Sequence, residues 1–270
     1  MEQILKQIEL FEHKYIFRGV PNKNFKMIPS LLRVDALDDA VVDYGNYYEE
    51  FLNNAVIKLS KVVKVDYLTS IEYLQHFDCK TNLLDFSNSF LVALFFACFE
   101  RFDEDGKVYV LDVTKYNEYL KEINDPTCKF DVTSTNVMNY LIEYNNNGTI
   151  SIDGIGIHNP LIVQPTLLFD RIRSQNGLFM LWGSNTDDLD TILKDVNDEK
   201  KIYQEIIIKK ELKKDILNLL EKKYFITETS LMVNTEDINN KISELYSMDD
   251  YNKYKKINKR KKLWVNYHIN

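Results

Sequence analysis

Apolar and polar positions along the chain fall into blocks whose spacing predicts their secondary structure. Residues 91–99 are entirely apolar, so this segment is expected to be buried. Residues 106–113 show alternation and contain several β-branched side chains, which is typical of a strand, and 202–209 is predicted to form another strand. Residues 211–224 have helical spacing. The pattern therefore predicts helices and strands within one fold.

The N-terminal part of the chain is predicted to be mainly helical. Apolar residues recur at helical spacing in 2–14, 38–64 and 66–77, and the short segment 15–17 has strand character. The residue before Pro29 is expected to be extended, and Ser30 is then a candidate cap for a helix.

Nothing in the sequence divides the chain into separate globular units. It has no internal repeat, no low-complexity linker and no glycine- or proline-rich boundary, and 160–165 and 171–182 add two further extended pieces. We predict one α+β domain over residues 1–245, with mixed small sheets and a helical N-terminal half, followed by a basic helical extension over 246–270.

A polar stretch directly before the apolar run is the main candidate for a functional site. Gln75, His76, Thr81, Asp85 and Ser87 lie within an otherwise apolar context. Polar groups beside a core need hydrogen-bond partners. These side chains are therefore expected either to knit a structural junction together or to line a cleft.

Composition and charge place the chain in a broad class. It has 270 residues, 45% hydrophobic content and a net charge of −7. These values are typical of a folded protein with an acidic body. Residues 253–262 are basic and contain no acidic side chain, so this tail could dock on nucleic acid or could be a solvated helix end. Unpaired cysteines, an N-terminus without signal-peptide form and the lack of a long apolar stretch predict a cytoplasmic protein without membrane spans.

Several chemistries are disfavoured because their motifs are missing from the sequence. It contains no phosphate loop, dinucleotide glycine fingerprint, nucleophile elbow or paired-histidine helix. The scattered histidines predict no metal site; they are His13, His76, His158 and His268.

Several blocks, in their order and spacing, resemble the FRG domain family, which is named after a phenylalanine-arginine-glycine triplet. The blocks are Phe17-Arg18-Gly19, 28–33, 74–85, 91–97, 171–179 and 226–231. The resemblance covers roughly residues 10–242. The chain departs from the family pattern at Asp78, Lys80, Asn82 and Phe86, where members tend to carry glycine, proline, arginine and tryptophan. Asn82 in place of the arginine removes a possible contact to an anion.

The resemblance implies an ADP-ribosyltransferase-like core that uses NAD. In such folds an arginine or histidine of the first strand holds NAD, and a late glutamate orients the nicotinamide ribose. Arg18 is the candidate for the first role, and Glu205 or Glu228 for the second. Arg18 could instead form a structural salt bridge with Asp85, Glu205 could face solvent on an edge strand, and Glu228 could cap a loop.

The remaining candidates have both a functional and a structural interpretation. His76 could act as a general base or bond to a backbone carbonyl. Gln175 precedes Asn176-Gly177, which would let a ligand approach the backbone or form a turn. Three polar residues could contact ribose hydroxyls or cap the helix starting near Ser89, namely Thr81, Asp85 and Ser87. The nucleotide-binding set is Arg18, Gly19, Gln75, Thr81, Asp85, Ser87 and Gln175.

Three functions remain open at this point. The first is an NAD-dependent ADP-ribosyltransferase or NAD glycohydrolase that acts as a bacterial toxin or phage-defence effector on a protein or nucleic-acid acceptor, restrained by an inhibitory partner protein. The second is a non-catalytic sensor that binds a nucleotide or a protein segment. The third is an effector whose basic tail docks on nucleic acid.

Overall fold

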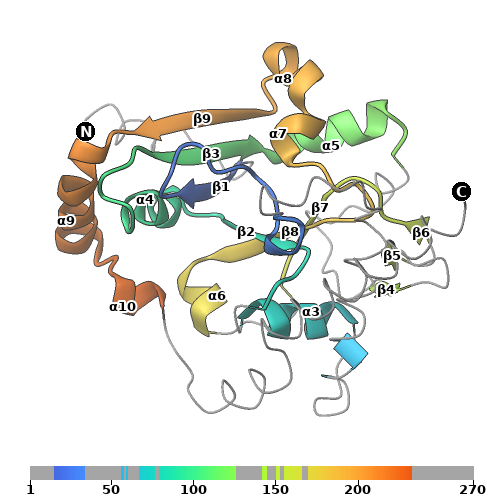
Figure 1. The fold of residues 1–270 in the computed structure, drawn as a ribbon, viewed down its shortest axis with the longest axis horizontal. Helices are drawn as coiled ribbons and strands as arrows, with labels where there is room; N and C mark the ends of the chain where they lie inside the picture. Colours follow the sequence, from blue (N-terminus) through green and yellow to red (C-terminus); the bar gives the residue numbers. More distant parts are fainter. Residues whose placement is uncertain are drawn as a thin grey trace, which may run out of the picture.

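The structure is a computed structural model and describes residues 15–33, 56, 57, 59, 67–76, 79–125, 142–144, 150–152, 155–165 and 170–232. Within these residues the main sheet has six strands in the order β7-β8-β2-β1-β3-β9, and all neighbouring pairs are antiparallel (Figure 1). These strands are β1 (Tyr15–Val20), β2 (Leu83–Ser87), β3 (Gly106–Asp112), β7 (Leu161–Val163), β8 (Gly177–Leu181) and β9 (Tyr203–Ile208). A smaller sheet contains β4 (Ile142–Tyr144), β5 (Ile150–Ile152) and β6 (Ile155–Gly156).

Helices lie between the strands, which confirms the predicted α+β class. They are η1 (Ser30–Leu32), α3 (Tyr67–His76), α4 (Phe90–Cys98), α5 (Val113–Glu122), α6 (Asp170–Ser174), α7 (Leu189–Ile192), α8 (Lys194–Lys200), η4 (Lys210–Leu212), α9 (Lys213–Tyr224) and α10 (Glu228–Leu231). The main sheet is larger than the small sheets expected. The predicted helices 2–14 and 38–64 and the extension 246–270 lie outside the described residues, apart from 56, 57 and 59, which are helical.

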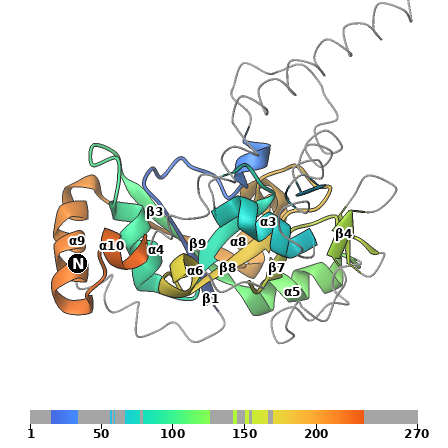
Figure 2. The ribbon, with the colours of Figure 1, turned by 90° about the horizontal axis from the view of Figure 1, so that it is seen from below.

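The main sheet is covered on both faces. Every residue of β3 is buried, and its alternate residues belong to two separate cores because successive strand side chains point to opposite faces. Val108 and Val110 share one core with residues of α4 and α9, whereas Tyr109 and Leu111 share the other with residues of α3, α5 and α7. Figure 2 shows α4, α9 and α10 on one side of the molecule and α3 and α5 on the other.

Helix α4 lies in backbone contact with two strands. A Cβ atom on Gly19 of β1 would lie 1.7 Å from the carbonyl oxygen of Ala93, and one on Gly106 of β3 would lie 2.1 Å from that of Ala97. Both alanines occupy one face of α4, since they are four residues apart. Any side chain at Gly19 would push the helix away, so the packing of α4 against the sheet requires glycine there.

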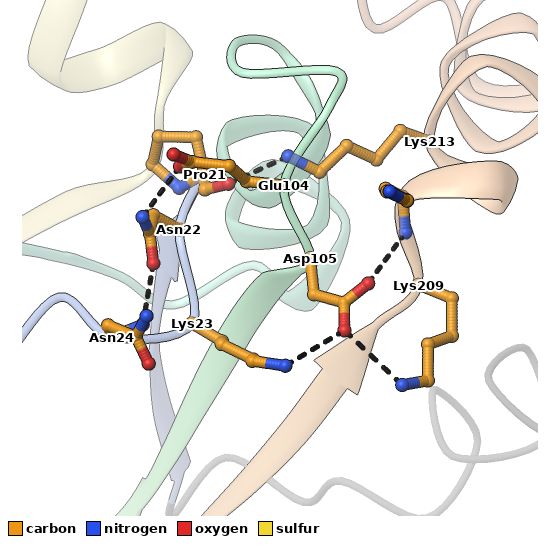
Figure 3. A network of polar contacts seen from close by, with 9 residues as sticks. Pro21, Asn22, Lys23, Asn24, Glu104, Asp105, Lys209 and Lys213 are labelled. Atoms are coloured by element: carbon orange, nitrogen blue, oxygen red, sulfur yellow. Dashed lines mark hydrogen bonds and ion pairs between the residues drawn. The ribbon is translucent and has the colours of Figure 1, made fainter.

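A polar network ties the ends of β1, α4 and β9 together (Figure 3). The buried ammonium of Lys213 donates to the carbonyls of Pro21, Glu100 and Arg101 at 2.7, 2.9 and 2.9 Å. All three ammonium protons are thereby satisfied, which offsets the cost of burying the charge.

Asp105 occupies the other part of this network. It accepts hydrogen bonds from the Lys210 backbone amide and from the ammonium groups of Lys23 and Lys209. Figure 3 shows Asp105 between Lys23 and Lys209. These bonds, with the backbone bond from Lys210 as the largest contribution, lower the pKa of Asp105 to about 2.

The predicted helix caps are partly corrected by the structure. Ser30 does not cap η1: Pro29 occupies the cap position, and the Ser30 hydroxyl accepts from the backbone amide of Thr81 at 3.3 Å. Helix α4 is capped by Ser89, whose hydroxyl accepts from the backbone amide of Val92. Of the three residues suggested as alternative caps for α4, none takes this role.

Candidate functional site

The candidate site begins where two central strands separate. β1 and β2 are paired only at Phe17 with Ser87, whereas β1 pairs with β3 along its whole length. Next to this point, Nη1 of Arg18 donates to the main-chain carbonyl of Asp85 at 2.5 Å. A side chain therefore links the two strands where their main-chain ladder ends. The suggested salt bridge is not what forms, because Arg18 bonds the carbonyl of Asp85 and not its carboxylate.

A cleft of about 220 Å³ opens at this separation. Most of the predicted site residues line it, and they come from β1, α3, β2 and the turn before β8. They are Arg18, Gly19, Gln75, His76, Asp85, Ser87 and Gln175. The fold thus gathers side chains that are far apart in sequence, and the polar stretch both lines this cleft and forms hydrogen bonds within a junction.

Arg18 is the most perturbed cation of the cleft. Burial lowers its pKa to about 10, with Asp85 acting in the opposite direction and nearby Arg33 adding to the lowering. The guanidinium is therefore still charged at neutral pH. Its Nε atom is buried and, among the described residues, has no hydrogen-bond partner. A buried donor without a partner is costly, so this atom is suited to bind a ligand.

The carboxylate of Asp85 is oriented by a chain of hydrogen bonds from α3 and the following loop. The Leu83 amide donates to Oγ1 of Thr81 at 3.2 Å, and that hydroxyl donates to Oε1 of Gln75. Nε2 of Gln75 then donates to Oδ2 of Asp85 at 2.8 Å. An amide N–H can only donate, so the direction of every bond in the chain is determined. Thr81 does not line the cleft but positions a residue that does.

The opposite wall of the cleft is anchored by Ser87 and Gln175. The Ser87 hydroxyl donates to the Gln175 carbonyl at 2.7 Å and accepts from the Ser89 amide at 2.9 Å. The Gln175 side chain donates through Nε2 to the carbonyl of Leu231 in α10 at 3.0 Å. These bonds join β2, the turn before β8 and helix α10 at one place.

Comparison with protein-family models assigns part of the chain. Residues 13–106 match the FRG domain. This part of the chain is therefore similar to the FRG family. The match includes β1 with Arg18 and Gly19, helix α3, β2 and α4, so the resemblance inferred from the sequence is confirmed there, while the extent 1–245 stays a prediction. No curated protein and no solved structure matches the chain.

Neither predicted glutamate lines the cleft where β1 and β2 separate, which we call the FRG cleft. Glu205 lies on the edge strand β9, where its Oε1 atom pairs with the buried ammonium of Lys107 at 2.7 Å. Glu228 is the exposed first residue of α10, and Thr227 caps that helix. Among the described residues, Asp85 is the one carboxylate lining the cleft. Sequence order alone could not distinguish these carboxylates, because strand pairing decides which of them faces the cleft.

The structure adds cleft residues that the sequence analysis did not select. Arg171 in α6 brings a second guanidinium, and Phe96 of α4, together with Phe179 of β8, adds aromatic surface. Arg171 belongs to a block that resembles the family, so this signal was available. Phe96 lies in the entirely apolar run, where no pattern distinguishes a cleft aromatic from a core one.

Asn82 does not face the FRG cleft. It is 4% exposed, and its Nδ2 atom donates to the Trp182 carbonyl at 2.7 Å. The Trp182 backbone amide in turn donates to the main-chain carbonyl of Asn82. Position 82 therefore contacts Trp182 and does not line the cleft, whereas Arg18 and Arg171 do.

Two further properties bear on possible partners. Among the described residues, no group of histidine, cysteine, aspartate and glutamate side chains is placed to hold a metal ion. In the same part of the chain, no helix combines the length and apolarity needed to cross a membrane.

Proposed function

We propose that the FRG cleft binds NAD and that the protein is an effector which cleaves its nicotinamide N-glycosidic bond, as an ADP-ribosyltransferase or an NAD glycohydrolase. The observation that carries this proposal is the juxtaposition, in one cleft, of Arg18, whose buried Nε atom has no hydrogen-bond partner in the described part of the chain, with the oriented carboxylate of Asp85. Two positive guanidinium groups, from Arg18 and Arg171, would attract the anionic diphosphate of a dinucleotide.

The chemistry assigns a role to each group. The bond from the ribose C1′ atom to the nicotinamide nitrogen breaks, its electron pair leaves with nicotinamide, and the ribose acquires oxocarbenium character. Asp85 would stabilise that charge through a ribose hydroxyl. A nucleophile, either water or an acceptor side chain, then attacks C1′ and loses its proton, and His76 is the candidate base.

The size of the cleft limits how NAD could sit in it. Its volume of about 220 Å³ is below the ~300–1,000 Å³ of typical ligand pockets, so part of a dinucleotide would extend outside. We place the nicotinamide riboside and the adjoining phosphate inside, because that is where the reacting bond lies.

The proposal is tested by NAD turnover with the purified full chain, using labelled NAD and cell extract as acceptor. Arg18→Ala and Asp85→Asn are expected to lower nicotinamide release about a hundredfold or more. Glu205→Gln and Glu228→Gln are the matched controls, since they remove the same charge outside the cleft. Loss of turnover in a glutamate variant with Asp85→Asn active would overturn the assignment of the carboxylate.

A non-catalytic nucleotide sensor is the second candidate, and one observation favours it. The Asp85 carboxylate already accepts a hydrogen bond from Gln75, and neither glutamate reaches the cleft. Calorimetric binding of NAD that depends on Arg18, without nicotinamide release, would establish this function. Binding of nucleic acid through 253–262 remains a separate prediction, tested by the salt dependence of binding before and after truncation at Tyr251.

The toxin or phage-defence setting is also part of the proposal. Induction of the wild-type gene is expected to arrest growth, and Arg18→Ala is expected to restore it. An inhibitory partner protein would act by restoring growth to cells that express the wild type. Growth arrest that is equal in wild type and Arg18→Ala would show that toxicity does not depend on Arg18 or its cleft.

A further inference from the structure

The block 226–231 resembles the family but has no role in the proposed chemistry, and it contains helix α10. Thr227 and Ser230 form a reciprocal capping box, with the Ser230 amide donating to Oγ1 of Thr227 at 3.1 Å and the Thr227 amide donating to Oγ of Ser230 at 2.9 Å. Leu231 is 3% exposed and belongs to the buried core that also contains Phe17. This short helix is therefore held at both ends.

The carbonyl of Leu231 determines how Gln175 presents its amide. A carbonyl oxygen can only accept, so the atom of Gln175 that lies 3.0 Å from it must be the NH₂ group. The Ser174 hydroxyl lies 3.2 Å from this carbonyl and 2.9 Å from the Arg171 carbonyl, so its single proton is shared between them and the end of α6 lies beside the same point. The Oε1 atom of Gln175 is thus the end left for the cleft, and within the described part of the chain no hydrogen bond reaches it.

We propose that Gln175 is a specificity-determining acceptor for a hydrogen-bond donor of the ligand, and that α10 is the element that positions it. The inference rests on the proposed function and deepens it by naming the group recognised, which is the carboxamide N–H of nicotinamide. A hydroxyl can donate or accept and would not need an amide of defined direction. A carboxamide offers a donor that its deamidated analogue, a carboxylate, lacks.

The surroundings of Gln175 fit a nicotinamide ring. Phe96 and Phe179 line the same cleft, and aromatic faces attract a positively charged pyridinium. Arg18 and Arg171 line the same cleft and supply the positive charge that would attract the phosphates. The block 226–231 then acts through Gln175, and Glu228 has no part in the reaction.

The test compares the affinity of the full chain for NAD and for nicotinic acid adenine dinucleotide, measured by calorimetry. The wild type is expected to bind NAD at least about tenfold more tightly, since one buried hydrogen bond and an unpaired acceptor are at stake. Gln175→Met keeps the side-chain volume and removes the acceptor, so it should bring the ratio of the two affinities close to one.

The positioning role of α10 is tested with Thr227→Val combined with Ser230→Ala, which removes both halves of the capping box. This variant should reduce the ratio in the same direction, and adding Gln175→Met should reduce it no further. Thr229→Ala is the matched control, because Thr229 is an exposed residue of α10 outside the capping box, and it should keep the wild-type ratio. A loss of stability alone would weaken both affinities equally and leave the ratio unchanged.

The outcomes separate this inference from the function on which it rests. If the wild type binds neither dinucleotide, the proposed function fails and the inference fails with it. If it binds NAD and Gln175→Met retains the wild-type ratio, the inference alone is overturned. If Gln175→Met loses the ratio while the capping variant keeps it, the role assigned to α10 is wrong.

Discussion

Lys213 gives the sharpest test of how the cleft is held in shape. Its side chain is fully buried at the start of α9, and its three hydrogen bonds join the segment after β1 to the segment after α4. Strand β1 and helix α4, which precede these segments, meet at Gly19 beside the cleft. Burial lowers the pKa of Lys213, whereas Cys98 and nearby acidic side chains, Glu104 first among them, act in the opposite direction.

The expected effect of Lys213→Met follows from the groups it leaves behind. Methionine fills most of the volume but cannot donate, so three carbonyl oxygens lose their donor. Each buried acceptor left unsatisfied costs about 1–3 kcal/mol. Glu100 and Arg101 are exposed residues, so water can reach part of this site, and we use the lower end of the range. The free energy of unfolding should therefore fall by about 3 kcal/mol, out of a typical ~5–15 kcal/mol.

Urea unfolding of the full chain, followed by circular dichroism, measures this loss directly. Lys214→Met is the matched control, because Lys214 is exposed and its ammonium lies 5.8 Å above the Phe102 ring. It should change the free energy of unfolding by no more than about 0.5 kcal/mol. If Lys213→Met costs no more than Lys214→Met, the three hydrogen bonds do not stabilise the fold and the reasoning is refuted.

Three further predictions concern the sheet, the network and the cleft. Gly19→Ala should lower the free energy of unfolding by at least about 2 kcal/mol, because its Cβ atom would overlap the Ala93 carbonyl, and the urea midpoint should fall accordingly. An unchanged midpoint would contradict the close contact between β1 and α4. Asp105→Asn should lower stability above about pH 4, and the difference from wild type should shrink as pH falls through about 2, since the pKa of Asp105 is depressed in the folded state; a difference that does not vary with pH in acid would refute this. Thr81→Val should reduce NAD turnover more than NAD affinity, as it releases Gln75 and hence Asp85, and equal losses would argue against an orienting role.

Much of the secondary structure was accessible from local pattern. The apolar run is the buried helix α4, and the two segments predicted to be strands are β3 and β9, because hydrophobic pattern and β-branched content are properties of short segments. The strand predicted over 15–17 extends to Val20 and carries Arg18 and Gly19 within it. A charged residue and a glycine are poor strand formers, so their place in β1 reflects pairing with β3 and packing against α4.

The candidate site was accessible in part. The density of polar residues before an apolar run indicated Gln75, His76, Asp85 and Ser87, all of which line the cleft. The choice between carboxylates was not accessible, because Asp85, Glu205 and Glu228 differ in the strand or helix that carries them and not in any local signal. The role of Arg18 as a link between β1 and β2 also depends on where their pairing stops.

The sequence by itself determined the α+β class, the buried helix, the principal strands and the match of residues 13–106 to the FRG domain. These follow from periodicity and from motif order, which are written along the chain. Only the tertiary structure decided that β1 and β2 separate, that Arg18, Asp85 and Gln175 face one cleft, and that α10 holds Gln175. The physical reason is that strand register and the hydrogen bonds between distant segments are set by the packing of the whole chain, since each bond depends on a partner that local sequence does not specify.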